Sequence, residues 1–110
     1  MQEEYFTKQD WIHFRSKSIE WQDKYMEKLC REYTELLSQD AKASKKFWTL
    51  VNRIKLDKRS PGVMLEMRKS LLIQNIIALI YDEVINVEDL ADFSNKLQER
   101  VKSLLEFYTY

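Results

Sequence analysis

Histidine and cysteine are the side chains of this sequence that could most readily bind metals or act as nucleophiles, and each occurs once. His13 is the only histidine and Cys30 the only cysteine. Zinc and iron sites built on nitrogen and sulfur need several such ligands, so one of each argues against a metal centre. We expect His13 to be a solvated side chain on the polar face of a helix. Cys30 reads as a small residue at the edge of an apolar stripe.

Carboxylates could supply acid–base chemistry, and three of them cluster at Glu88, Asp89 and Asp92. The cluster has no glycine-containing loop of the calcium-binding type, so these side chains read as helix caps and a solvated face. The sequence also has no glycine-rich phosphate loop and no nucleophile elbow. We therefore predict no enzyme activity, no cofactor and no metal. A carboxylate-based enzyme, or a small-ligand pocket inside a helical bundle, is kept as a third hypothesis.

Basic residues concentrate in the middle of a chain whose 18 basic and 18 acidic residues cancel. Residues 42–69 contain nine basic and two acidic side chains, whereas 1–41 contain six and nine, and 70–110 three and seven. Basic side chains around an exposed aromatic ring can hold phosphates and stack a base. The candidates for such a nucleic-acid-binding module are Lys42, Lys45, Lys46, Trp48 and Arg53. The alternative, which the sequence leaves open, is that this segment pairs with acidic faces of neighbouring helices.

The elements that must position these residues are helices, because strand-like alternation is absent and the only proline and glycine stand together at Pro61–Gly62. The predicted helices cover 8–38, 41–56, 61–85 and a last segment over 87–108. That last segment reads either as one helix or as a short helix near 87–93 followed by a second. The predicted caps are Thr7 with Asp10, Ser38 or Asp40, Ser60, Asn86 with Asp89, and Ser94.

The fold class predicted from this pattern is all-α: a compact antiparallel bundle of four main helices in one domain over 1–110. The longest apolar run, 71–80, is about half the ~20 residues that a bilayer requires, so we expect a buried helix and no membrane span. Residues 1–4 show no basic region followed by an apolar stretch, so we expect no signal peptide. A lone cysteine favours a reducing compartment, so we expect the protein in the cytoplasm.

The first predicted helix carries more apolar surface than one neighbour can cover. Ile12, Ile19, Met26 and Tyr33 recur every seven residues, and an aromatic stripe lies beside them. Together they exceed the narrow seam of a two-stranded coiled coil. The interface candidates are Trp11, Phe14, Arg15, Trp21 and Tyr25.

Protein binding is therefore the leading hypothesis for function. We expect a small cytoplasmic, non-enzymatic interaction or regulatory protein that binds another protein or itself through aromatic- and Met-rich helix faces. The identity of the partner and the oligomeric state stay open. The aromatic end of the chain, 107–110, is expected to pack back on the bundle.

Overall fold

The computed structural model describes residues 5–108. The expectation about a signal peptide at 1–4, and the end of the aromatic tail at 109–110, lie outside the described residues. The predicted all-α fold with four main helices is confirmed. The elements are α1 (Lys8–Ser38), α2 (Ala43–Asp57), the 3-10 helix η1 (Lys69–Leu71), α3 (Leu72–Tyr81), the 3-10 helix η2 (Val87–Leu90) and α4 (Asn95–Tyr108).

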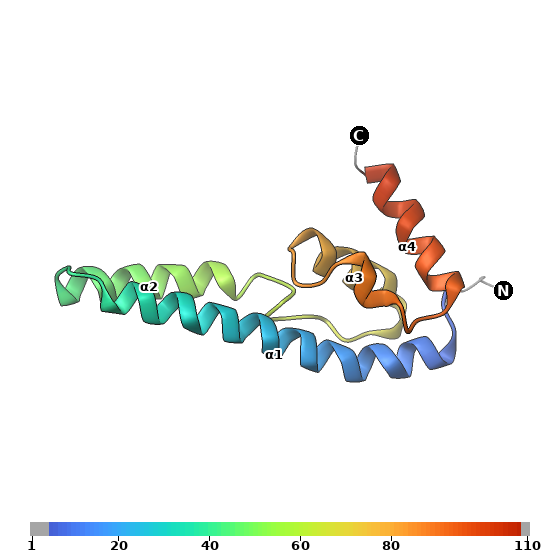
Figure 1. The fold of residues 1–110 in the computed structure, drawn as a ribbon, viewed down its shortest axis with the longest axis horizontal. Coiled ribbons are helices and arrows are strands. Elements are labelled where there is room, and N and C mark those ends of the chain that lie inside the picture. The colour runs from blue at the N-terminus through green and yellow to red at the C-terminus, as the bar shows by residue number, and fades with distance from the viewer. Residues whose placement is uncertain (1–4, 109–110) are drawn as a thin grey trace.

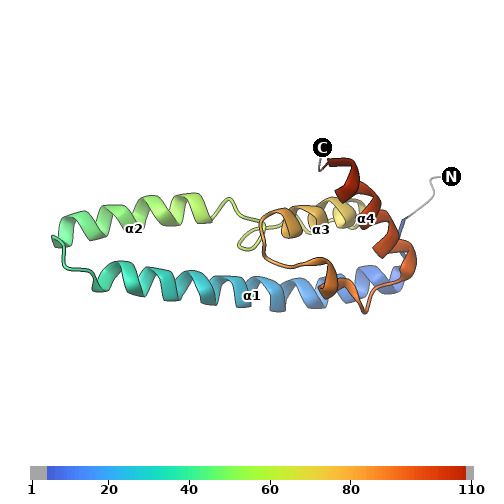
Figure 2. The same cartoon turned by 45° about the horizontal axis from the view of Figure 1, so that its top comes forward.

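The helices form two parts that share the long helix α1 (Figures 1 and 2). We call the hairpin of α2 and the C-terminal half of α1 the arm, residues 22–60. The head consists of residues 5–21 and 63–108. The molecule measures 59 × 32 × 24 Å, with a radius of gyration of 17.1 Å. A compact chain of this length would have about 13 Å, so the helices are more extended than the compact arrangement expected from sequence.

The hydrophobic core lies in the head. Its buried side chains come from the start of the chain, α3, η2 and α4: Phe6, Phe14, Leu72, Ile76, Leu79, Ile85, Leu90, Phe93, Leu97 and Val101. Helix α3 is apolar on nearly every side, as expected of a helix surrounded by others. Among the described residues of the arm, Leu29 is the only buried apolar residue. The two parts therefore differ sharply in how much apolar surface they hide.

Local signals set the ends of α1. The Thr7 hydroxyl accepts a hydrogen bond from the Asp10 N–H at 3.0 Å, and the Asp10 carboxylate accepts one from the Thr7 N–H at 2.9 Å. This capping box confirms the predicted start of the helix. The predicted cap of α2 is wrong, because α2 begins at Ala43 after Lys42, which makes no side-chain cap. The Ser38 hydroxyl instead donates to the Glu35 carbonyl within α1.

The predicted third helix over 61–85 is wrong at its beginning. Residues 60–63 form a tight turn in which the N–H groups of Val63 and Met64 both donate to the Ser60 carbonyl at 2.9 Å. A Cβ added to Gly62 would lie 2.4 Å from the Tyr25 ring, so the missing side chain lets this turn approach α1. Residues 64–68 have no regular secondary structure, and α3 occupies only Leu72–Tyr81.

The end of α3 depends on a left-handed residue. Glu83 has φ of 58°, and the Val84 N–H donates to the Leu79 carbonyl at 2.9 Å. This 6→1 hydrogen bond is the Schellman arrangement that stops a helix.

The remaining segment adopts the second of the two forms left open by the sequence: a short helical turn, η2, followed by α4. Asn86 and Asp89 form the predicted capping box of η2, and the Ser94 hydroxyl accepts from the Leu97 N–H at 3.2 Å, which confirms Ser94 as a cap. Phe107 is 71% exposed, and the expected packing of the aromatic end as a whole stays a prediction, because residues 109–110 lie outside the described range.

Candidate functional site

The five interface candidates do not form one surface. Trp11, Phe14 and Trp21 line up along α1 with ring centroids 6.2–6.4 Å apart, and Trp21 also approaches Phe93. Phe14 is completely buried, and the two tryptophans pack against the core. These aromatic rings hold the head on α1 and leave little surface for a partner.

The other two candidates lie at the margins of this packing. Arg15 is exposed and lies over the Trp11 ring, 5.9 Å from its centroid. Tyr25 is half-buried under the turn at Gly62. Burial along α1 follows Asp10, Phe14 and Ser18, which are four residues apart.

The stripe with seven-residue spacing faces away from the head. Ile12 is 48% exposed, Ile19 69% and Met26 36%. The sequence shows both apolar stripes of α1, but the choice between them depends on which stripe the head covers. This outward stripe of α1 is a stronger candidate for a binding surface than the aromatic stripe, which the head covers.

Polar contacts hold the two helices of the arm together. The Tyr33 hydroxyl donates to the Asp57 carboxylate at 2.5 Å, and Arg53 pairs with both Asp57 and Glu32. Near the tip, the Lys46 ammonium donates to the Leu37 carbonyl at 2.9 Å. Burial and the hydrogen bond to Asp57 raise the pKa of Tyr33 to about 12. The hydrogen bond with Glu32 raises the pKa of Arg53.

Exposed apolar side chains gather on one side of the arm. On α2, Phe47 and Ile54 each follow by one position a residue that contacts α1, namely Lys46 and Arg53. A step of one residue turns about 100° around a helix. In two antiparallel helices, side chains displaced in this way from both contact lines lie on the same side of the pair.

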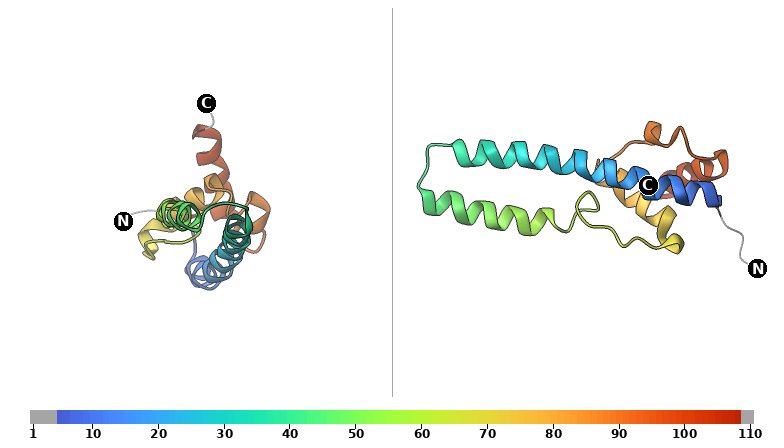
Figure 3. Two further views of the ribbon diagram at one scale, coloured as in Figure 1. Left: turned by 90° about the vertical axis from the view of Figure 1, so that its left-hand side faces the viewer. Right: turned by 90° about the horizontal axis from the view of Figure 1, so that it is seen from below.

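The same displacement holds on α1, where Cys30 and Leu37 follow Leu29 and Leu36. Leu29 is buried and Leu36 half-buried, whereas Cys30 and Leu37 are exposed. We call the resulting surface the arm face and define it by Met26, Cys30, Leu37, Phe47 and Ile54. Figure 3 (right) shows α1 and α2 lying side by side along the arm.

Helix α2 contributes no buried side chain to a hydrophobic core. None of the 15 residues of α2, all of which are described, is buried. Phe47 is 57% exposed although it belongs to the apolar side of an amphipathic helix. Helices in proteins gain most of their stability from packing such a side, and in α2 this side is left partly exposed.

The nucleic-acid candidates are divided by the structure. Lys46 and Arg53 are engaged with α1, through the Leu37 carbonyl and through Glu32. Lys42, Lys45 and Trp48 are exposed. At Arg53, the basic segment thus pairs with the neighbouring acidic helix, which is one of the two possibilities that the sequence left open.

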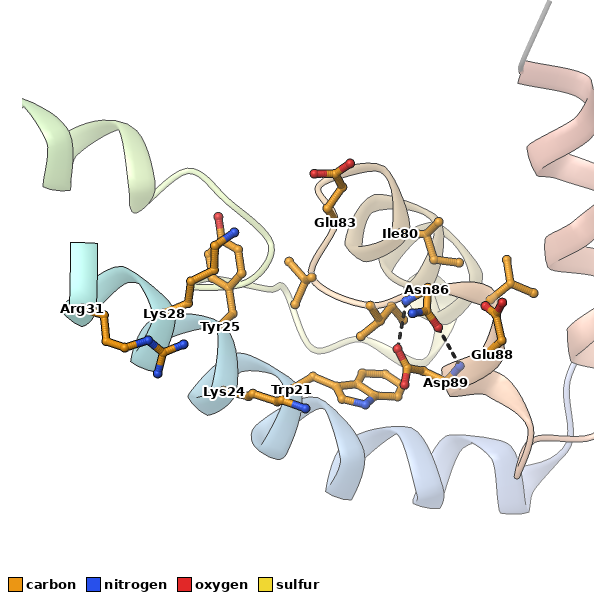
Figure 4. A pocket seen from close by; sticks show the side chains of 13 residues that line it. Trp21, Lys24, Tyr25, Lys28, Arg31, Ile80, Glu83, Asn86, Glu88 and Asp89 are labelled. Atoms are coloured by element: carbon orange, nitrogen blue, oxygen red, sulfur yellow. Dashed lines mark hydrogen bonds between the residues drawn. The ribbon is translucent and has the colours of Figure 1, made fainter. Parts of the chain in front are cut away.

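An open pocket of about 770 Å³ lies between α1 and the segment from α3 to η2 (Figure 4). Lys24, Lys28 and Arg31 project from α1 on one side, and Glu83 and Glu88 stand on the other. The two hydrogen bonds of the Asn86–Asp89 capping box also lie at the pocket wall.

The pocket residues have structural tasks of their own. Trp21, which lines the pocket, packs on the core, and Asp89 caps η2. The two amide side chains of α3, Gln74 and Asn75, do not line the pocket, and the Asn75 amide donates to the Glu66 carbonyl at 2.9 Å. Within residues 5–108, no group of three histidine, cysteine or carboxylate side chains is placed to hold a metal ion.

His13 is not the solvated side chain expected from sequence. Its ring lies edge-on to Phe93, with centroids 4.7 Å apart. Its Nε2 atom is buried and has no hydrogen-bond partner within residues 5–108. The side chain lies beside the buried face of α1 because η2 and the residues after it fold over that side. This contact cannot be predicted from the sequence around His13.

Comparisons with protein families, characterised proteins and solved structures find no match to this chain. No helix in the described part of the chain has the length and apolar character needed to span a membrane.

Proposed function

We propose that this chain is a non-enzymatic protein-interaction module whose working surface is the arm face. The observation that carries this proposal is the row of exposed apolar side chains on one side of the arm, drawn from both of its helices. Such gathered apolar surface on a small protein is typical of a docking site.

The composition of the arm face fits a protein partner. Phe47 and Met26 belong to the aromatic and methionine side chains that are enriched in protein interfaces. The head, in contrast, already has its own core. In this proposal the core of the head stabilises the fold, and the arm binds the partner protein.

Two alternatives have weaker support. A nucleic-acid-binding module would need its cations free, but Arg53 and Lys46 are held by α1. A ligand pocket or carboxylate-based enzyme would use the open pocket, which is not enclosed from solvent and whose Asp89 serves as a cap. A lone cysteine supports the cytoplasm as the place where the module acts.

The test uses Cys30 as a reporter, because this exposed thiol lies on the arm face. A brief maleimide pulse is applied to a native lysate of cells that produce the protein, followed by quenching and measurement of the modified fraction. We expect Cys30 to be protected in the wild type. Protection should disappear in the double variant Phe47→Gln, Ile54→Gln, which removes apolar contact from the face.

The matched control is Trp48→Gln, Leu56→Gln. These side chains are 61% and 63% exposed, but they point away from the arm face, since each lies one or two positions beyond Phe47 or Ile54. Protection should persist in this control. Full reactivity of wild-type Cys30 in the lysate would refute the proposed function.

A further inference from the structure

We propose that the arm face is covered by a second copy of this chain, in a dimer whose two-fold axis runs parallel to the arm. Each α1 then lies antiparallel against α2 of the partner subunit, and four arm helices form one bundle. This inference rests on the proposed function and names its partner. Two arms can stack face to face about a two-fold axis that runs either parallel to the arm or across it, and the proposed dimer has the parallel axis.

The apolar part of the arm face suits a copy of itself. Two-fold interfaces are self-complementary, so the patch must contain both members of each contact. The Lys46–Leu37 bond places Phe47 at the level of Leu37 along the arm. A two-fold axis parallel to the arm preserves this level. Leu37 therefore meets Phe47 of the partner subunit, and the partner's Leu37 meets Phe47.

Charge selects the direction of stacking. At the outer edge of the arm face, α1 carries Asp23 and Glu27, and Glu27 lies 3.8 Å from Arg31 of the same helix. On the other edge, α2 and the residue after it carry Lys55 and Lys58. In the proposed dimer each acidic edge faces a basic edge. With the axis turned across the arm, α2 would lie on the partner's α2, and lysine would face lysine. Complementary edges favour the first arrangement.

The levels of these charges also match. Glu27 lies five residues before Glu32, and Lys58 lies five residues after Arg53, which pairs with Glu32. Because both helices rise 1.5 Å per residue, Glu27 and Lys58 stand at the same level on opposite edges of one arm. The two-fold axis then brings Glu27 beside Lys58 of the partner subunit, twice in each dimer.

The outward stripe of α1 extends the contact beyond α2. The segment that follows α2 runs beside the N-terminal half of α1 (Figure 3). This segment carries Met64 and Met67, which are 62% and 41% exposed. In the dimer it lies against the partner's α1 near Ile19, which is the most exposed residue of the stripe.

The heads do not obstruct this stacking. On α1, Phe14 and Ser18 are buried under the head, whereas Ile12 and Ile19 are exposed. Figure 1 shows α3 and α4 on one side of α1, with the opposite side of that helix uncovered. Two arms can therefore meet while both heads stay on the outside.

The experiment is a charge exchange followed by analytical ultracentrifugation of the full chain over a concentration series. We expect a wild-type dimer. Each single variant, Glu27→Lys or Lys58→Glu, should raise the dissociation constant about tenfold or more, since each puts two repulsive pairs into one dimer. The combined variant should return to within about threefold of the wild type, because the pairs are re-formed with reversed sign.

Matched controls carry the same changes of charge on the opposite side of the arm, at Glu35→Lys and Lys45→Glu. These should leave the dissociation constant unchanged, and circular dichroism should show equal helix content in all variants. If the wild type is a dimer but the combined variant does not regain its dissociation constant, the proposed arrangement of the two arms is wrong.

A wild-type chain that stays monomeric at every concentration would overturn the dimer altogether. In that case, protection of Cys30 in the lysate distinguishes two results. A protected thiol would leave the proposed function standing with a different protein on the arm face. A reactive thiol would remove both proposals.

Discussion

Asp10 joins α1 to α4 at the base of the head. Its carboxylate, which is 3% exposed, accepts hydrogen bonds from the Thr7 N–H, from the Ser94 N–H at 2.9 Å and from the Ser94 hydroxyl at 2.5 Å. Residues 84 positions apart are thus fastened by one side chain, which caps one helix and holds the cap of another.

We predict that Asp10→Ala lowers the free energy of unfolding by about 2–3 kcal/mol, because several buried donors lose their acceptor. Urea unfolding at neutral pH measures this change. The control Asp40→Ala, at an exposed position between α1 and α2, should cost under about 0.5 kcal/mol. Equal effects at the two positions would contradict the role given to Asp10.

The same carboxylate makes stability depend on pH. Burial alone raises the pKa of Asp10, but the hydrogen bonds from Ser94 and Thr7 outweigh it and lower the pKa below 3.8. The folded state therefore favours the ionised form. Its stabilisation is present above the unfolded pKa of about 3.9 and is lost as pH falls through the folded value. The difference in unfolding free energy between wild type and Asp10→Asn should accordingly shrink as the pH is lowered below about 4.

Glu83 is the one non-glycine residue with positive φ in the described range. A left-handed conformation costs a residue with a Cβ about 1 kcal/mol or more relative to glycine. We predict that Glu83→Gly raises the free energy of unfolding by about 1 kcal/mol. The control Glu88→Gly, in η2, should lower it, and thermal unfolding of both variants measures the two signs. A loss of stability in Glu83→Gly would contradict this explanation of how α3 ends.

At the scale of elements, the sequence predicts best where a structural signal is local. The bounds of α1 follow from Thr7 and Asp10 at one end and from uninterrupted helical spacing up to Ser38. The start of α3 could not be predicted in this way. Ser60–Pro61 has the pattern of a helix start, but the turn is decided by contact of Gly62 with Tyr25, which lies 37 residues earlier.

The candidate site shows the same limit. The stripe of Ile12, Ile19 and Met26 is visible in the sequence, and so is the aromatic stripe beside it. Only the packing of the head decides which stripe is hidden. Phe14 becomes core because Phe93 and Leu97 return to α1 from the far end of the chain, and no local pattern contains that information.

The pairing of α1 with α2 depends strongly on Tyr33. Since the pKa of Tyr33 is raised to about 12, the folded arm holds the neutral phenol beyond the unfolded value of about 10. This stabilisation is present below pH ~10 and is lost as pH rises through the folded value. We predict that, in difference titrations of tyrosinate absorbance, Tyr33→Phe removes the component with the highest pKa. The Tyr33–Asp57 bond would be contradicted if the component lost in Tyr33→Phe titrated near 10 instead.

At the scale of the whole molecule, one chain combines a head with a core and an arm without one. The head buries side chains from four elements, whereas α2 buries none. A helix of 15 residues is marginal in water unless tertiary contacts support it. The arm is therefore expected to be the less stable part whenever its apolar face is uncovered.

Hydrogen exchange of the purified chain tests this central claim most directly. In the variant Phe47→Gln, Ile54→Gln, we predict that amides of Ala43–Asp57 exchange much faster than in the wild type, while amides of α3 keep their protection. The control Trp48→Gln, Leu56→Gln should resemble the wild type in both helices. If α2 stays as protected as α3 in the Phe47→Gln, Ile54→Gln variant, the arm is complete on its own and needs no partner.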